Sequence, residues 1–315
     1  MYQQYLYYKA INWNVVEDEL DNATWERATS LFWLDTRIPI EEDLGKWLAL
    51  SDDEKDQLNR LLAVLNLLAT YQSIEAGEII RHSERSQQEI AIINNLQFTE
   101  MVNTKAYNRI LRIFNDNQDV SQWFDSADSD PALQDLLQEV DAIYAGSDPL
   151  RKRFMVLCLE GLINSAFLAY PIHLWVDKGF KQLGETIKMV LRNESLHAIY
   201  LSHKLGLMMA QQEINQVNSF LAWAQETVVD LVNRLTTLVV TYYQVPGSVN
   251  LGIDFVRESA NEILTSLNLS AQYSTRKELL APYEHALAPL RRHDLTKHGR
   301  NMVQNDAMTD DDYDF

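Results

Sequence analysis

Five long stretches of this chain place apolar residues at the three- and four-residue spacing of an amphipathic helix. The stretches cover about 51–82, 87–115, 149–176, 180–207 and 214–243. Helix breakers are rare: 10 glycines and 7 prolines in 315 residues make 17, where an average usage of about 12% would give roughly 38. Long helices with short joints predict one all-α bundle in which neighbouring helices run antiparallel.

Residues typical of helix ends and turns divide these stretches. Ser51, followed by three acidic residues, favours a helix start, and Pro246 ends the last stretch. The segment before Pro39 predicts an irregular entry into the fold. Residues 115–131 are polar and rich in turn formers, so they predict a surface connection with a short helix after it.

The charge and the cysteine content narrow the class of protein. The chain carries 27 basic and 45 acidic residues, a formal charge of −18, which argues against nucleic acids and anionic membranes as partners. Its one cysteine, Cys158, excludes an intramolecular disulfide and a four-cysteine metal site. The first residues lack the features of a cleaved leader, and no uninterrupted apolar run approaches the roughly 18 residues of a membrane span. We therefore expect a soluble, cytoplasmic protein.

Carboxylates and a histidine occur at helical spacing in two of the stretches. Glu194 and His197 lie three residues apart, one turn along the same helix face. Glu100 and Asn103 have the same spacing, and Tyr107 lies a further turn along that face. A single pair of this kind is more often a solvated helix face than a metal site.

Glu160 gives these pairs more weight, because it is a lone carboxylate inside a strongly apolar helix. A buried charge is costly unless it is paired, protonated or bound to a metal; the alternative is a place on an exposed stripe. Bundles that hold two iron or manganese ions use one glutamate from each of two helices and a Glu-x-x-His pair from each of the other two. Here Glu160, Glu194 and His197 complete one arm, while Glu100 and Asn103 leave the other incomplete.

Several segments together resemble the small, radical-generating subunit of class I ribonucleotide reductase, most closely class Ib. These are AINWN at 10–14, FWL at 32–34 followed by Ile-Pro, LLATYQ at 67–72, FTEMVNTKAY at 98–107, the helix around Glu160, RNESLH at 192–197 and DDDYDF at 310–315. The resemblance implies a ferritin-like helical bundle that forms homodimers. It also implies an oxidoreductase: the family stores a tyrosyl radical beside a dinuclear metal centre and passes the oxidising equivalent to a large subunit, which reduces ribonucleotides to deoxyribonucleotides.

The resemblance assigns roles to individual residues. Tyr107 matches the radical tyrosine, and Trp33 matches the tryptophan that relays electrons to the metal site. Residues 1–290 match the bundle domain, and 291–315 match the flexible tail that docks on the large subunit. Four of the metal ligands are matched by Glu100, Glu160, Glu194 and His197. The docking part of the tail is matched by Asp310, Asp311, Asp312 and Tyr313.

Three positions depart from the family pattern. Ala69 stands where the family has an aspartate ligand, and Asn103 where it has its first histidine ligand. Asn193 replaces the aspartate that links this histidine to Trp33, and residues 291–309 contain no Tyr or Trp to match the relay tyrosine of the tail. Three carboxylates and one histidine balance at most one divalent ion. We therefore predict a metal-free or mononuclear centre, with iron or manganese as the ion.

The substitution at position 193 also predicts a change of hydrogen bonding. An aspartate beside a lost histidine would be an unpaired buried charge, which an asparagine removes. The amide of Asn193 keeps a donor and an acceptor for Asn103 and Trp33. We expect a neutral hydrogen-bonded chain of these three residues in place of a charged one.

Three functions stay open. The first is a working small subunit with an altered centre, activated through a modified tyrosine or by a flavodoxin-like partner. The second is a catalytically silent paralogue that binds the large subunit or an active small subunit. The third is a mononuclear oxidase with another substrate. The retained glutamates favour the first, because an idle site would be expected to lose buried charges; the lost ligands favour the second. The acidic tail argues against the third, although it is also interpretable as a solubilising terminus.

Overall fold

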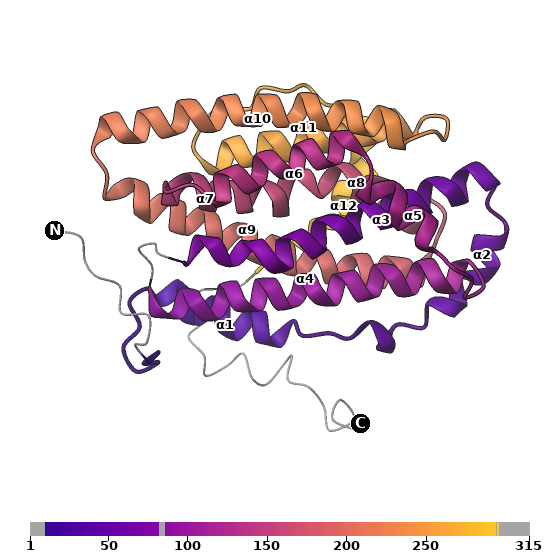
Figure 1. Cartoon of the computed structure of the whole chain (residues 1–315), viewed down its shortest axis with the longest axis horizontal. Helices are drawn as coiled ribbons and strands as arrows, with labels where there is room; N and C mark the ends of the chain where they lie inside the picture. The colour runs from indigo at the N-terminus through magenta and orange to yellow at the C-terminus, as the bar shows by residue number, and fades with distance from the viewer. Residues whose placement is uncertain (1–9, 82–85, 294, 296–315) are drawn as a thin grey trace.

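Long helices lie side by side along the longest axis of the molecule (Figure 1). The computed structural model describes residues 10–81, 86–293 and 295. The α-helices are α1 (Glu19–Ser30), α2 (Leu44–Leu48), α3 (Asp52–Glu75), α4 (Gln87–Phe114), α5 (Ser121–Asp128), α6 (Pro131–Tyr144), α7 (Pro149–Cys158), α8 (Ser165–Val176), α9 (Lys181–Ala210), α10 (Ile214–Tyr242), α11 (Ser248–Ser266) and α12 (Lys277–Leu287). Short 3-10 turns occupy Asp35–Arg37, Ile40–Asp43 and Ala76–Ile79. The described ranges contain no strand, and the predicted all-α class is confirmed.

Three of the predicted helices, α4, α9 and α10, have boundaries close to those observed, whereas α3 ends at Glu75 rather than near residue 82. The start of α3 agrees with the prediction, and its cap shows why. Ser51 caps this helix by accepting from the backbone N–H of Glu54, whose carboxylate accepts from the backbone N–H of Ser51 in return. The leucines of its apolar repeat are buried, and α3 packs along α4. These two helices carry the LLATYQ and FTEMVNTKAY segments, so their packing brings both segments into the core.

The predictions failed where helices bury few apolar side chains. The segment before Pro39 is not irregular, because it contains α1, whose buried residues include Asp21 and Thr24. The polar connection 115–131 holds α5, in which only Ala127 is buried. Polar residues at interior positions hide the apolar period on which the prediction depends.

The span Pro149–Val176 is long and apolar enough to cross a membrane, but 89% of its most apolar window is buried inside the bundle. It is therefore a core element, interrupted by a π-helical turn at Leu159–Ile163 between α7 and α8. Within this turn the backbone N–H of Asn164 donates to the carbonyl of Leu159 at 3.2 Å. Such turns concentrate at functional sites, and this one carries Glu160.

The predicted tail falls mainly outside the described residues. Residues 296–315, which include Asp310, Asp311, Asp312 and Tyr313, are not described. The division of the chain at 290 and 291 therefore stays a prediction.

Candidate metal and radical site

Three glutamates from different parts of the bundle meet in its interior. Glu100 comes from α4, Glu160 from the π turn and Glu194 from α9, and none is more than 5% exposed. Burial, with the charges of Glu160 and Glu194, raises the pKa of Glu100 well above its usual value. Burial and the charge of Glu160 likewise raise the pKa of Glu194. These acids therefore lie close enough together to oppose each other's ionisation.

Each glutamate is held by a neutral amide. Gln72 donates to Glu160 at 2.8 Å, Asn103 to Glu100 at 3.2 Å, and Asn164 to Glu194 at 2.9 Å. The amide oxygen of Gln72 accepts from the hydroxyl of Tyr144 at 2.9 Å. No lysine or arginine forms an ion pair with the three acids in the described part of the chain. Their charge is thus left for protons or for a bound cation to balance.

His197 connects α9 to the π turn. Its Nδ1 lies 3.1 Å from Oε2 of Glu160, and its Nε2 is buried without a hydrogen-bond partner. Two ligands bound at about 2.1 Å and at right angles to one ion are about 3 Å apart. Carboxylate oxygens with an imidazole nitrogen suit iron and manganese. This pair therefore fits one transition-metal ion in both chemistry and spacing.

The remaining carboxylates are turned toward their asparagines. In the observed side-chain positions, no three histidine, cysteine or acidic side chains of the described residues gather closely enough to hold an ion. Glu100 or Glu194 must leave its amide partner to complete a ligand set with Glu160 and His197. The donor set fits one ion after such a rotation.

Few donors lie at the positions where the resemblance implies ligands for a second ion. Ala69 is 3% exposed and offers only a methyl group, and the side-chain nitrogen of Asn103 is engaged with Glu100. The oxygen of Asn103 is buried without a partner. A neutral amide oxygen is a weak substitute for an aspartate and a histidine together.

The predicted hydrogen-bonded chain through Asn193 is wrong. Asn193 donates to the carbonyl of Met189, one turn back along α9, at 3.0 Å. Its oxygen, the indole N–H of Trp33 and the oxygen of Asn103 are buried without partners in the described protein. The backbone carbonyl four residues earlier competes successfully for the short asparagine side chain.

Tyr107 lies one turn beyond Asn103 on α4 and is 2% exposed. Burial, followed by the charges of Glu194, Glu100 and Glu160, raises its pKa well above 10. The phenol is therefore neutral near the carboxylates, and its hydroxyl makes no hydrogen bond with the described residues. Trp33, 7% exposed, packs in the same core between α1 and the turn Asp35–Arg37.

A cavity of about 210 Å³ borders the carboxylates of Glu160 and Glu194. Leu287, Leu290 and Arg291 from the C-terminal part of the chain also line it. Its volume corresponds to several water molecules at about 30 Å³ each. A small molecule therefore has room beside two of the candidate ligands.

Most of the chain matches one protein family. The model of that family, described as ribonucleotide reductase, small chain, matches residues 10–279. The chain belongs to this family. The Escherichia coli (strain K12) ribonucleoside-diphosphate reductase 2 subunit beta is 26% identical over 259 residues, which cover 82% of this chain and 81% of that protein. The Mycoplasma genitalium ribonucleoside-diphosphate reductase subunit beta is 24% identical over 315 residues, which cover 98% and 92%.

Solved structures agree with the family. The dimanganese(II)-NrdF crystal structure from Streptococcus sanguinis has a TM-score of 0.84 at 29% identity, covering 91% of this chain and 100% of that one. The ribonucleotide reductase R2 subunit from Clostridium botulinum has a TM-score of 0.72 at 16% identity, covering 89% and 91%, and shows the shared fold. The predicted class I small subunit, most like class Ib, and its ferritin-like bundle are confirmed. So is the main functional prediction, an oxidoreductase subunit of the ribonucleoside-diphosphate reductase beta type.

Three polar residues of the site were not predicted from the sequence as members of it. Asn164 and Tyr144 were not singled out, and Gln72 was quoted only as part of a motif. Asn164 is an amide in the same apolar span as Glu160, so the argument that singled out the glutamate could have found it. Nothing in the sequence around Tyr144 indicates its contact with Gln72.

Proposed function

We propose that this chain is a ribonucleoside-diphosphate reductase small subunit that stores an oxidising equivalent on Tyr107 beside a centre for at most one ion. The observation that carries this proposal is the group of three buried glutamates and His197, which no lysine or arginine of the described residues neutralises. Buried acids without counter-charges are destabilising. Their retention favours a site that is still used.

Iron or manganese suits this donor set, and the related Streptococcus sanguinis structure is a dimanganese protein. Glu160 and His197 would hold the ion, with Glu194 and Glu100 as further ligands. A bound ion of either metal would supply one-electron redox chemistry. Gln72 orients Glu160 by donating to its carboxylate, and Tyr144 orients Gln72 by donating to its amide oxygen.

Tyr107 would hold the radical. Its burial excludes water and reductants from the ring, and oxidation of a neutral phenol requires loss of a proton as well as an electron. The nearby carboxylates are the groups whose charges act on the phenol most strongly, with Glu194 first. We propose that one of these carboxylates accepts the proton from the hydroxyl of Tyr107.

The relatives named as beta subunits imply partners for this chain. We propose that it forms a homodimer and docks on a reductase large subunit through the acidic end of the tail, Asp310, Asp311, Asp312 and Tyr313. A flavodoxin-like protein is the proposed activating partner, and the apolar-lined cavity beside Glu160 and Glu194 gives a small oxidant room at the centre.

A silent paralogue is the second candidate, and one observation favours it. The indole N–H of Trp33 has no hydrogen-bond partner among the described residues, and Asn193 is turned toward Met189. The link through which the family relays electrons between tryptophan and metal is therefore not made by these side chains. A protein in this state would still bind its partners through the tail.

The decisive experiment combines metal analysis with electron paramagnetic resonance (EPR). Protein purified from its native host is loaded with Fe²⁺ or Mn²⁺, oxidised with and without the flavoprotein, and compared with Tyr107→Phe. One ion or fewer per chain and a radical signal absent from the variant would support the proposal. Close to two ions per chain, located by anomalous scattering, would overturn the one-ion centre. No radical under any activating condition, with large-subunit binding intact, would favour the silent paralogue.

A further inference from the structure

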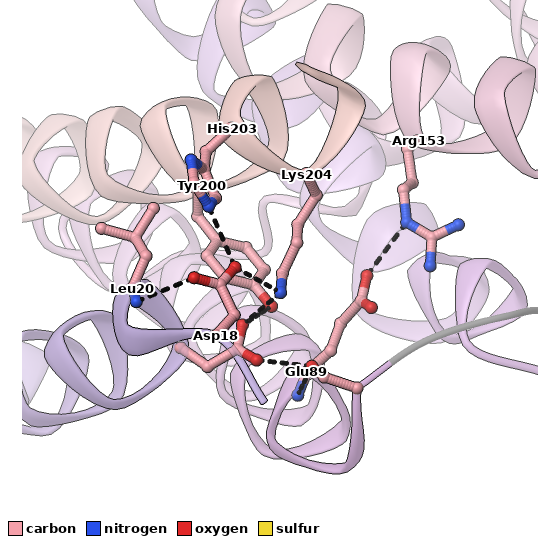
Figure 2. Close-up of polar contacts among 9 residues, drawn as sticks. Asp18, Leu20, Glu89, Arg153, Tyr200, His203 and Lys204 are labelled. Atoms are coloured by element: carbon pink, nitrogen blue, oxygen red, sulfur yellow. Dashed lines mark hydrogen bonds and ion pairs between the residues drawn. The ribbon is translucent and has the colours of Figure 1, made fainter. Parts of the chain in front are cut away.

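A second group of charged side chains, most of them buried, joins several helices of the bundle (Figure 2). We call it the charged layer, and its members come from four helices. They are Asp18, which caps α1, Asp21 of α1, Glu89 of α4, Arg153 of α7 and Lys204 of α9. Asp21, Glu89 and Arg153 are at most 2% exposed, and Lys204 is 6% exposed. No role in the proposed chemistry accounts for charges buried this deeply.

Lys204 joins α9 to α1. Its ammonium lies 2.8 Å from Asp18 and 2.6 Å from Asp21. Asp21 also accepts from the hydroxyls of Tyr200 at 2.7 Å and of Ser86, the N-cap of α4, at 2.5 Å. Burial opposes the charge of Lys204, but its bonds to the two aspartates outweigh that effect and raise its pKa. Lys204 therefore stays cationic and is fixed to the N-terminal end of α1.

Arg153 joins α7 to α4. Its Nε donates to Glu89 at 3.0 Å, with both side chains almost completely buried. Glu89 lies one turn inside α4 from Ser86, whose hydroxyl accepts from the backbone N–H of Glu89. The ion pairs of Lys204 and of Arg153 are thus connected through Ser86 at the N-terminus of α4. Figure 2 shows Lys204 and Arg153 with their acidic partners.

The charged layer is in register with the centre on each shared helix. Arg153 precedes Glu160 by seven residues, and Lys204 follows His197 by seven. Seven residues make two helical turns, about 10 Å along the axis and about 20° from the same azimuth. Glu89 precedes Glu100 by eleven residues, or three turns. The helices that present Glu100, Glu160 and His197 to one another are therefore clamped on the same faces a few turns away.

Rotation of α7 matters especially for Glu160. The π turn begins at Leu159 and contains Glu160, so Arg153 lies on the last regular part of α7 before the hydrogen-bond pattern changes. A buried ion pair has a short, directional geometry, but on balance it contributes little more stability than apolar side chains of similar volume. Its distinctive effect is to specify which rotation of the helix is populated.

We propose that the charged layer sets the rotation and axial register of α7 and α9 so that Glu160 and His197 meet. Arg153 and Lys204 are then positioning residues for the centre. The inference deepens the proposed metal site, but its main test uses metal-free protein. The positioning role of the charged layer can therefore be tested even if the chain binds no metal.

The test removes both charges of one pair at once. The double variant Glu89→Leu/Arg153→Met removes both charges of this pair together, so its melting temperature should stay near that of the wild type or rise. The readout is the ring ¹⁵N spectrum of His197, assigned by the loss of its signals in His197→Gln. We expect the wild type to show one ring tautomer, fixed by Glu160, and the double variant to show shifted or exchange-broadened signals. In loaded protein, the Mn²⁺ affinity should fall about tenfold.

A second pair and a control keep the result interpretable. Lys204→Met/Asp21→Asn tests the α9 side if the first variant does not fold, and it should move the same signals. The control is Asp254→Asn/Arg276→Met, which removes an ion pair of 2.6 Å between the buried Asp254 of α11 and the half-exposed Arg276 just before α12. It should leave His197 unchanged. A folded layer variant with an unaltered His197 spectrum would overturn the proposal and leave the layer a purely structural element.

Discussion

The imidazole of His293 lies with Nε2 at 2.6 Å from the hydroxyl oxygen of Ser195, the residue that follows Glu194. Arg27 donates to Nδ1 of the same ring at 3.5 Å, so the proton of the neutral ring is on Nε2, which donates to Ser195. The serine hydroxyl donates in turn to the carbonyl of Leu290 at 3.2 Å. This contact attaches the C-terminal segment to α9 beside the centre and requires a neutral histidine.

The contact predicts a pH-dependent contribution to stability. Burial, with the charges of Arg27, His197 and Arg192, lowers the pKa of His293 to about 4, whereas an unfolded histidine titrates near about 6.5. The contribution is therefore present above about pH 6.5 and is lost as the pH falls toward 4. We expect His293→Phe to melt below the wild type at pH 7.5 and the difference to shrink toward zero near pH 4. A difference that does not vary with pH would contradict this origin.

Glu100 should oppose folding of the metal-free protein at neutral and alkaline pH. Its pKa is raised well above 4.5, mainly by burial; a carboxyl of this kind favours folding below about pH 4.5 and opposes it as the pH rises. We expect Glu100→Gln to stabilise the metal-free protein at pH 8, by about 1 to 3 kcal/mol, and to change it little at pH 5. The exposed Glu226→Gln on α10 is the matched control. Thermal unfolding with a chelator checks this, and added Mn²⁺ should reverse the order at pH 8.

Tyr107→Phe should separate the chemistry from the fold. The hydroxyl of Tyr107 has no hydrogen-bond partner among the described residues, so its removal should change the free energy of unfolding by less than about 0.5 kcal/mol. Radical formation should be lost completely. EPR and thermal unfolding of the same preparation measure both. A signal of undiminished size in the variant would place the radical elsewhere.

Restoring three side chains should restore a second metal position. In the variant Ala69→Asp/Asn103→His/Asn193→Asp, an additional carboxylate, a histidine and its acidic partner are available. We expect close to two ions per chain, and a metal-free form less stable than the wild type because it buries further charge. The control is the variant Ala69→Asn/Asn103→Gln/Asn193→Asp. It places neutral amides at positions 69 and 103 instead of a carboxylate and an imidazole. One ion or fewer in the restored variant would show that the backbone around α3 and α4 has also changed.

Removal of residues 310–315 should abolish binding to a reductase large subunit without altering the melting temperature. The segment lies beyond the described bundle, so its loss removes no described core contact. Binding by calorimetry, with the separate peptide as a competitor, checks this prediction. A variant with Asp310, Asp311 and Asp312 changed to asparagine tests how much of the binding free energy comes from charge. That electrostatic part should weaken at higher salt. Unchanged affinity after truncation would exclude the tail as the docking segment.

The apolar repeat was enough to predict the helices that form the core. α4, α9 and α10 begin and end within about three residues of their predicted limits, because their buried faces are made of aliphatic side chains. α1 escaped prediction because its inward face is held by Asp21 and its ionic partners. A polar interior contact depends on residues far away in the sequence, which no local pattern contains.

The same limit applies to the candidate site. Glu160 was conspicuous as a charge in an apolar run, and Glu100, Glu194 and His197 followed from spacing and resemblance. The contacts of Gln72 with Glu160 and of Asn164 with Glu194 depend on how helices distant in the sequence pack together. Asn193 was assigned the wrong partners, because the choice between a distant side chain and the carbonyl of Met189 is decided by three-dimensional distance.

The π turn gives this site a vulnerability to changes of length. A π turn contains one residue more than the α-helical turn it replaces, so Leu159–Ile163 is equivalent to a helix that has accepted a one-residue insertion. Deleting one residue of the turn after Glu160 would let an uninterrupted α-helix form, with α7 and α8 still in register but the side chains inside the turn re-aimed. Glu160 would leave the position in which Gln72 donates to it and His197 lies 3.1 Å away, whereas the bond from the hydroxyl of Tyr243 to the carbonyl of Ala166 in α8 would survive. The smallest genetic lesion able to dismantle the centre therefore replaces none of its ligands.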